Sequence, residues 1–528
     1  MSDNRNGVLV ILTGGNVCLV AAQDPRRNAV TIHRPATIKD FYKYVIGDEN
    51  ERSILLRERT IKGEELKIDT YDLRTDPNRI SIDPEELDSS QVDPTLWASI
   101  AQVIDNKYLE YEGFVVLHGL DTMAYTASGL SFMLGELQVP VVFTGSQRPL
   151  NYLRTDAIQN IRSAISIAGA ASLGLGTPVP EVTVCSYDSL FRANRCTMVH
   201  ASSYRAFDSP NYPTLATLGE HIEIQNDLKR SPSRTKRVVL RKNVNSTVTI
   251  LDVFPGMNQY IIEHLTKTEG LKGVLLRTYG LGTAPTMKKG ILDALEKVVN
   301  ANIVVMNVSQ ARGGRISFNQ DPVSLRLFEH GVISGVDMTA EAAYAKMVIE
   351  LSNPSKKEVK TKKEKREIAE DLLQINTCGE QSLSILHFHF KPGCTEKQSD
   401  GTYRAILEPL REMEGRHLLI NNHDKITYIQ LRILGVEPTE ITETRVNRVI
   451  DFDAHLVSKQ QKDNEISITL RKDVLRWFST GSRTINVAYD ITNSIEHLLN
   501  PDTVLRIDTI ESIKWKKLTI AIYANVSL

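Results

Sequence analysis

The chain has 528 residues, and its 63 Lys and Arg against 64 Asp and Glu give a formal net charge of −1. This balance argues against binding nucleic acid or a membrane through bulk charge, and the length suffices for large cores that need no disulfide or metal. Five cysteines without CxxC pairing are typical of reduced thiols, so we expect a cytoplasmic protein.

The first part of the sequence alternates apolar strands, glycine turns and helices. Continuous apolar runs predict strands buried on both faces, at Gly7–Leu12, Phe114–Leu117 and Val141–Phe143. Helical spacing of apolar residues predicts helices between and after them, at Pro94–Asp105, Ala124–Leu137 and Arg154–Ala168, the last capped by Thr155. The pattern predicts an α/β domain with a mainly parallel sheet, in which ligands bind beyond the carboxyl ends of the strands.

A polar stretch, residues 219–246, is predicted to be a linker or an irregular hairpin and contains KRSPSRTKR. The same alternation then resumes, with strands and helices expected at Val248–Val253, Gly273–Arg277, Lys289–Asn300, Ile303–Val308 and Asp337–Leu351. The Lys- and Glu-rich stretch Ser355–Glu370 is interpreted as a solvated helix with i,i+4 charge pairs, and a basic docking site is the alternative.

After about Glu380 the pattern becomes β-rich. Alternating or β-branched runs separated by turn residues predict strands at Ser384–Phe390, Ile426–Leu434, Ile466–Leu470, Thr484–Tyr489 and Leu518–Val526. The predicted organisation is therefore two α/β subdomains, residues 1–218 and 247–380, joined by a linker at 219–246 and followed by a β-rich domain, residues 381–528, for which a sandwich is one arrangement.

Two segments fall at predicted strand ends, ILTGGN at Ile11–Asn16 and VLHGLDTM at Val116–Met123. Further motifs follow in order: LDSSQVDPTLW, FTGSQRPLNYLRTDA, FRANRCTMV, SPNYPTLATLG, YGLGTAP and GVISGVDMTAEAA. With these motifs the sequence from Val8 to about Leu373 resembles the bacterial-type, cytoplasmic (type I) L-asparaginases. The resemblance implies an asparaginase-like fold of two α/β subdomains, and a homo-oligomer, usually a dimer or a dimer of dimers, with active sites near subunit contacts.

Position by position, the resemblance implies that the catalytic groups of this family are missing. The threonine nucleophile that ends TGGT is Asn16 here, and the second catalytic threonine, in HGTDT, is Leu120. The lysine of the proton relay is Met198, and the asparagine of a GNAP-like motif is Thr283. An amide and two apolar side chains cannot attack a carbonyl and relay its proton as the original set does.

The residues that hold substrate in the family are better preserved. They correspond to Asp88, Ser89 and Asp121. A tyrosine-bearing gate is not recognisable in Val17–Val30. Leucine and methionine make part of the expected pocket apolar, so it should bind the asparagine zwitterion poorly.

Several other residues could carry chemistry, and each has a structural alternative. Thr13 and Thr122 are displaced nucleophiles or, alternatively, hydroxyls that brace a turn and a helix start. Cys18 is a reactive thiol only if its pKa is lowered, and otherwise a buried apolar residue. His118 is a general base or a structural hydrogen-bonding residue, while His387 and His389 share a strand face without making a metal site.

We therefore expect an asparaginase-like protein that has lost L-asparagine amidohydrolase activity and acts as a binding, structural or regulatory protein. The alternatives are a rewired amide or acyl hydrolase, and an assembly protein that reuses the symmetry of an oligomeric enzyme. No cofactor or metal is expected, and neither GxGxxG nor GxxxxGK[ST] is present. The expected partners are an amino-acid-like small ligand, further copies of the chain, and a protein bound through the C-terminal domain, but neither nucleic acid nor membrane.

Overall fold

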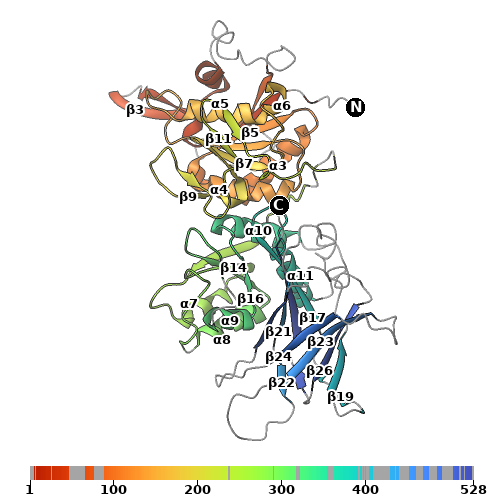
Figure 1. Ribbon diagram of the computed structural model, residues 1–528. Helices are drawn as coiled ribbons and strands as arrows, with labels where there is room; N and C mark the ends of the chain where they lie inside the picture. The colour runs from red at the N-terminus through yellow and green to blue at the C-terminus, as the bar shows by residue number, and fades with distance from the viewer. Residues whose placement is uncertain are drawn as a thin grey trace.

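The computed structural model describes most of the first 390 residues and a series of strands beyond them. The described parts are Arg5, residues 7–24, 27–46, 66–75, 88–235, Val238, 240–288, 290–316, 322–353 and 361–390, and the strands between Gly393 and Asn525. An N-terminal α/β domain, a second α/β domain and a group of strands follow one another along the molecule (Figure 1). Within these residues no helix combines the length and the apolar character needed to cross a bilayer.

The N-terminal domain is built on an eight-stranded sheet. Its order is β12 (Ile222–Ile224), β11 (Ala216–Leu218), β8 (Ser189–Arg192), β7 (Val182–Ser186), β6 (Val141–Thr144), β5 (Gly113–Leu117), β1 (Val8–Leu12) and β4 (Ile68–Asp72). The strands from β7 to β4 are parallel, and β8, β11 and β12 add an antiparallel edge. The three predicted strands are confirmed as β1, β5 and β6. The sheet also extends, through β12, into the stretch predicted as a linker or hairpin.

Side chains of β1 alternate between two apolar cores, one on each face of the sheet. Leu9 and Ile11 join the core beneath α3 (Pro94–Lys107) and α4 (Leu120–Leu134), whereas Val8 and Val10 face α5 (Ala157–Ala168). A short helix, α6 (Ala170–Leu173), follows α5. Burial on both faces is the reason for the continuous apolar runs.

Two predicted helix boundaries were wrong. Helix α4 begins at Leu120 instead of Ala124, because Gly119 is its extended N-cap, and it ends before Gly135, whose φ of 64° stops it short of Leu137. Helix α5 begins at Ala157 instead of Arg154, although the hydroxyl of Thr155 accepts a hydrogen bond from the Ala157 amide at 3.1 Å as a capping residue does.

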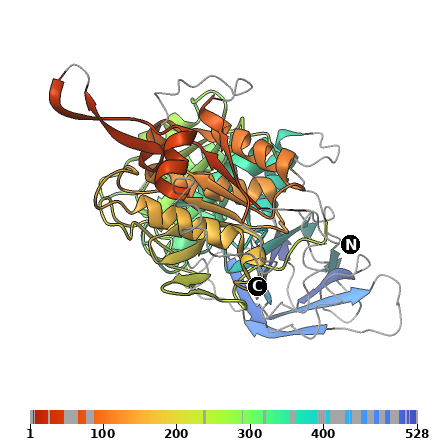
Figure 2. The same cartoon turned by 90° about the horizontal axis from the view of Figure 1, so that it is seen from above.

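A hairpin projects from the N-terminal domain (Figure 2). It pairs β2 (Leu19–Asp24) with β3 (Arg27–Pro35) and runs into α1 (Ile38–Phe41) and a π-helical turn, Tyr42–Ile46. A smaller antiparallel pair, β9 (Thr197–Met198) and β10 (Phe207–Asp208), lies against α4.

The second domain has a four-stranded parallel sheet in the order β13 (Thr247–Asp252), β14 (Leu271–Thr278), β15 (Val304–Ser309) and β16 (Val332–Ser334). Its helices are α7 (Gln259–Leu265), α8 (Ile291–Asn300), α9 (Pro322–Glu329) and α10 (Ala340–Ser352). The predicted strands and helices are present here within a few residues of their expected bounds. Helix α10 packs on both β14 and α4, so it joins the two domains.

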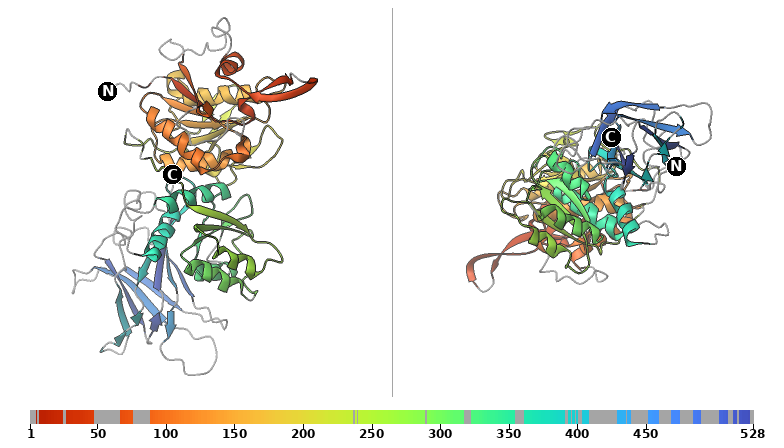
Figure 3. Two further views of the ribbon diagram at one scale, coloured as in Figure 1. Left: turned by 180° about the vertical axis from the view of Figure 1, so that it is seen from behind. Right: turned by 90° about the horizontal axis from the view of Figure 1, so that it is seen from below.

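The Lys- and Glu-rich stretch forms α11 (Lys362–Leu373), while residues 355–360 of that prediction lie outside the described part. One predicted i,i+4 pair is present, with Arg366 Nε 3.3 Å from Glu370 Oε1. The helix is solvated only at its start, since Ala369 and, beyond the predicted stretch, Leu373 are buried. Figure 3 shows α11 running between the second α/β domain and the C-terminal strands.

A buried ion pair fastens the segment after α11 to α10. Lys346 Nζ lies 2.7 Å from Glu380 Oε1, and both side chains are fully buried. The ammonium also donates to the carbonyls of Leu373 and Ile375, and the carboxylate accepts from the amides of Thr377 and Cys378. This network satisfies both charges, as burial requires.

Beyond Gln381 every described element is a strand. All described pairings among them are antiparallel, in agreement with the predicted β-rich C-terminal region. The strands are β17 (Leu383–Phe390), β18 (Gly393–Cys394), β19 (Glu396–Lys397), β20 (Tyr403–Leu407), β21 (Ile429–Leu434), β22 (Val436–Pro438), β23 (Asp451–Ser458), β24 (Ile468–Val474), β25 (Thr484–Tyr489), β26 (Thr503–Thr509), β27 (Ile513–Trp515) and β28 (Leu518–Asn525).

Candidate functional site

The two motifs at predicted strand ends meet in space. Strands β1 and β5 are parallel neighbours, with Leu12 opposite Leu117, so the turns that follow them leave the same edge of the sheet. The Thr13 amide and hydroxyl both donate to the Leu117 carbonyl, at 3.1 and 2.8 Å. A Cβ placed on Gly15 would lie 2.2 Å from Gly119 Cα, so the two turns are in backbone contact. Thr13 therefore braces this junction, as its structural alternative predicted.

Asn16, at the nucleophile position, is exposed and opens a short 3₁₀ helix, Asn16–Cys18. Its Nδ2 donates to the Gln147 carbonyl at 3.0 Å. An amide in this contact ties the loop to the segment after β6. It is a neutral donor and has no tendency to attack a carbonyl.

Leu120 is the first residue of α4, half-buried and packed against the core that α3 and α4 share. Its Cδ2 lies only 2.8 Å from where a Cβ on Gly145 would be. Asp121 follows in the first helical turn and is exposed, where a carboxylate is favoured by the helix dipole. An apolar residue thus stands, along the chain, between the end of β5 and the retained carboxylate.

Asp88 and Ser89 lie at the start of a 3₁₀ turn, Ser89–Gln91. The Asp88 carboxylate accepts from the Ser90 amide at 2.8 Å, and this hydrogen bonding lowers the pKa of Asp88 from its usual value. Ser89 is buried against Gly119. Thr122 Oγ1 donates to the Ser89 carbonyl at 2.7 Å, so this hydroxyl braces the turn that contains Ser89. The structural alternative to a nucleophile, a hydroxyl that satisfies N–H groups at the helix start, was therefore wrong in its hydrogen-bond partner.

Met198 and Thr283 lie apart from this junction in the sequence and belong to different elements. Met198 pairs with Phe207 in the β9–β10 ribbon and packs, half-buried, against the same core as Leu120. Its neighbour Thr197 donates to Glu341 Oε1 at 2.6 Å. Thr283 bridges to Tyr279 in the loop after β14, in the second domain.

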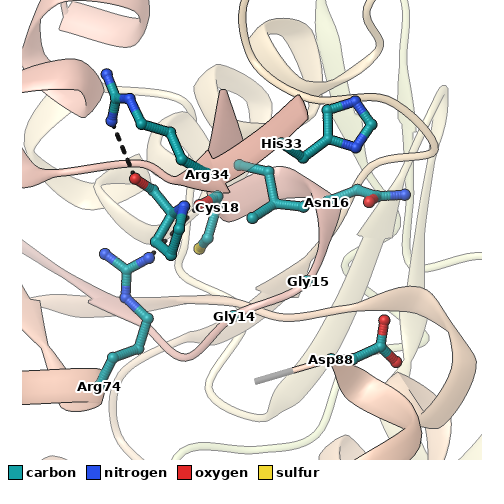
Figure 4. Close-up of a pocket in the computed structure, with 10 residues that line it drawn as sticks. Gly14, Gly15, Asn16, Cys18, His33, Arg34, Arg74 and Asp88 are labelled. Atoms are coloured by element: carbon teal, nitrogen blue, oxygen red, sulfur yellow. Dashed lines mark hydrogen bonds between the residues drawn. The ribbon is translucent and has the colours of Figure 1, made fainter. Parts of the chain in front are cut away.

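A cavity of about 440 Å³ opens beside the first turn. In Figure 4, Asn16 and His33 lie on one side of it, Arg34 and Arg74 lie on the other, and Asp88 lies below. Its other described lining residues are Gly14, Gly15, Cys18, Leu19 and Pro35.

Of the predicted site residues, Asn16 and Asp88 line this cavity. Ser89, Leu120, Asp121 and Met198 are not among the lining residues that the structure describes. The open space therefore lies on the hairpin side of the junction.

Sequence reasoning missed the cationic wall of the cavity. Arg34 pairs with Asp40 at 2.8 Å, and the buried Arg74 pairs with Asp72 at 2.7 Å while donating to the Ala36 carbonyl at 2.6 Å. An arginine with an aspartate a few positions away is common in sequences, so neither pair indicated the wall of a cavity.

The hairpin beside the cavity is held by the loop after β6. His33 Nε2 hydrogen-bonds Tyr152 OH at 2.8 Å, the Asn151 side chain bonds both the amide and the carbonyl of Ala21, and the Leu150 amide donates to the Leu19 carbonyl. These contacts hold Leu19 and Ala21 of β2 and His33 of β3 in place.

Of the remaining candidates, Cys18 and His118 are buried. Burial raises the pKa of the Cys18 thiol, so this residue is not an activated nucleophile. Burial also lowers the pKa of His118 to about 4, and its Nδ1 hydrogen-bonds the Gly119 carbonyl at 2.8 Å, so the ring is neutral near pH 7. His387 and His389 lie two residues apart on β17, opposite Ala521 and Thr519. The described residues include no His, Cys, Asp and Glu cluster that could hold a metal.

Comparison with known proteins agrees with this architecture. The family model "Asparaginase, N-terminal" matches residues 7–230, and the model "Glutaminase/Asparaginase C-terminal domain" matches residues 247–362. L-asparaginase 1 of Escherichia coli K12 is 37% identical over 261 residues, which are 49% of this chain and 75% of that one. A mouse 60 kDa lysophospholipase is 37% identical over 267 residues, 51% of this chain but only 46% of the mouse protein, so the match spans about half of that relative.

Solved structures give the same result. The crystal structure of L-asparaginase I from Vibrio cholerae aligns with a TM-score of 0.56 and 29% identity, over 71% of this chain and 99% of that one. The thermostable L-asparaginase from Thermococcus kodakarensis aligns with a TM-score of 0.57 and 25% identity, over the same shares. The two family models together cover more than half of the chain, which therefore belongs to the asparaginase family.

Proposed function

We propose that this asparaginase-family protein does not hydrolyse L-asparagine and acts instead as a binding, structural or regulatory protein. The proposal rests on the residues at the two positions where the family has its catalytic threonines. Asn16 is tied to the Gln147 carbonyl, and Leu120 packs against an apolar core. Losing a nucleophile from an acyl-transfer site typically lowers turnover by about 10⁴–10⁶.

Nearby groups do not replace what is missing. The hydroxyls of Thr13 and Thr122 are committed to the backbone carbonyls of Leu117 and Ser89, and the Cys18 thiol is held protonated by burial. The neutral, buried His118 cannot serve as an exposed base near pH 7. These contacts disfavour the alternative, a rewired amide or acyl hydrolase.

The cavity beside Asn16 supports a ligand-binding role. It is lined by the glycine turn, Asn16, Asp88 and two arginines, and each guanidinium is already paired, Arg34 with Asp40 and Arg74 with Asp72. Such a set suits a small, amino-acid-like molecule with both charges. We further propose a cytoplasmic homo-oligomer, a dimer or tetramer, that can bind a protein through its C-terminal region; the buried free thiols Cys18, Cys185, Cys196 and Cys378 suit a reducing compartment.

Stepwise restoration tests this proposal. Asn16→Thr, Leu120→Thr and Met198→Lys are made singly and together, and ammonia release from asparagine is measured. We expect no activity from the single variants and measurable activity only when all three are combined. Acyl-enzyme on Thr13, Thr122 or Cys18 of the unaltered chain, detected by mass spectrometry after treatment with a reactive acyl donor, would favour the rewired hydrolase instead.

A further inference from the structure

Ser231 and Pro232 form a short exposed arch in the segment that connects the two α/β domains. Both residues are exposed and lie outside helices and strands, and within the described residues the Ser231 hydroxyl has no hydrogen-bond partner. The residues on either side are anchored. The Arg230 amide donates to Glu181 Oε1 at 2.9 Å, and the Ser233 amide donates to the Leu137 carbonyl at 2.8 Å. The arch therefore presents its hydroxyl to solvent at a fixed place on the molecule.

The sequence around this hydroxyl is basic and has a proline directly after it. Lys229 and Arg230 precede Ser231, Arg234 lies three positions after it, and Lys236 and Arg237 follow. Proline fixes φ and has no N–H to satisfy, so it favours an enzyme whose groove accepts an apolar ring next to the acceptor. An arginine three residues further on can reach an acidic group in the same groove.

We propose that Ser231 is a phosphorylation site for a proline-directed serine/threonine protein kinase. In that reaction the Ser231 Oγ bonds to the γ-phosphorus of ATP, the bond from that phosphorus to the β-phosphate oxygen breaks, and ADP leaves. The hydroxyl proton passes to the catalytic aspartate of the kinase. The inference concerns a segment anchored to Glu181 and Leu137, which precede β7 and β6, and does not depend on whether the candidate site at the carboxyl ends of the strands is active.

The phosphate would act on Arg230. The guanidinium of Arg230 donates to the Thr377 carbonyl at 3.2 Å and to the Gly135 carbonyl at 3.5 Å, two long bonds to neutral acceptors. A phosphate dianion on the adjacent residue is a stronger acceptor for a guanidinium. Phosphorylation should therefore withdraw Arg230 from Thr377, which lies in the buried segment leading to the C-terminal strands.

The chain contains two further Ser-Pro or Thr-Pro pairs within its described residues, and they serve as internal controls. The Ser209 hydroxyl is half-buried and donates to the Tyr212 carbonyl at 2.7 Å, and Tyr212 occupies the place that Arg234 has relative to Ser231. Thr177 is exposed, but the residue three positions after it is Pro180 and not a cation. Neither pair combines a free hydroxyl with the downstream cation.

Treatment of the folded full chain with a cyclin-dependent protein kinase and ATP, followed by peptide mass spectrometry, tests the site. We expect one phosphoryl group per chain, on Ser231, lost in Ser231→Ala and unchanged in Ser209→Ala. Arg234→Ala should slow incorporation about tenfold, the value of one charge-assisted hydrogen bond. No label on Ser231, or label there only after the chain has been heat-unfolded, would overturn the proposal.

Hydrogen exchange tests the effect on Arg230. We expect amides of residues 373–381 to exchange faster in the phosphorylated chain than in the unmodified one. Arg230→Ala should produce the same increase without kinase and leave no further increase on phosphorylation. Unchanged exchange in a chain phosphorylated on Ser231 would contradict the proposed role of Arg230.

Discussion

Gly15 and Gly119 touch through their backbones, and this contact holds the two turns of the candidate site together. A Cβ on Gly15 would lie 2.2 Å from Gly119 Cα and 2.5 Å from its nitrogen, and Gly15 has a φ of 76°. A side chain at Gly15 would therefore push the turn after β1 away from the turn after β5.

We predict that Gly15→Ala lowers the free energy of unfolding by about 2–4 kcal/mol, because overpacking adds to the strain of a positive φ. Gly256→Ala is the matched control, since Gly256 also has a positive φ, of 98°, but open space around its Cβ. Chemical denaturation of both variants measures the difference. Equal losses would show that the backbone contact between the turns contributes nothing.

The Asn16 amide should act as a tether. Asn16→Ala removes one neutral hydrogen bond to the Gln147 carbonyl and should cost about 1 kcal/mol. Asn16→Asp keeps the shape but sets a carboxylate oxygen against that carbonyl, so it should cost more than the alanine variant. The free energies of unfolding at neutral pH give the order, and an aspartate variant as stable as the original chain would rule out the tether.

Acid should destabilise the protein through His118. Burial lowers the pKa of His118 to about 4, whereas in the unfolded chain it is near 6.5. Between pH 4 and pH 6.5 the unfolded state binds this proton and the folded state does not. The contribution of His118 to the free energy of unfolding is therefore complete above pH 6.5 and is lost as the pH falls toward 4. The loss from this residue should reach about 3 kcal/mol. His118→Gln should show a shallower loss across this window in denaturation curves, and an identical slope would exclude this residue as the cause.

The buried pair of Lys346 and Glu380 should be costly to break from one side. Burial alone would raise the pKa of Glu380, but the charge and hydrogen bond of Lys346 outweigh burial and leave that pKa lowered. Lys346→Met strands a carboxylate and should cost about 3–5 kcal/mol. The double variant with Glu380→Gln should lose less than the sum of the single variants. Strict additivity in this double-mutant cycle would mean that the two residues are not coupled.

The sequence predicted the buried strands and the placement of both motifs at strand ends because these features depend on local patterns. The apolar runs Gly7–Leu12 and Phe114–Leu117 indicate strands buried on both faces, and parallel neighbours such as β1 and β5 place their carboxyl ends at one edge. The start of α4 was missed because its N-cap is Gly119, which makes no side-chain capping bond.

The cavity wall was missed for a different reason. Arg74 reaches the Ala36 carbonyl, 38 positions away in sequence, and His33 reaches Tyr152, 119 positions away. Such contacts depend on how the whole domain places the hairpin, so the spacing of residues in the sequence does not predict them. The loss of reactive groups at Asn16 and Leu120, in contrast, is visible in the sequence because it concerns residue identity.

The release of ammonia from L-asparagine by the pure, unaltered chain tests the central claim most directly. We predict no release above the background of a matched protein preparation, because Asn16 and Leu120 supply neither nucleophile nor relay. Ammonia release at the rate of an active asparaginase, lost in the variants Asp121→Ala and Ser89→Ala, would contradict it.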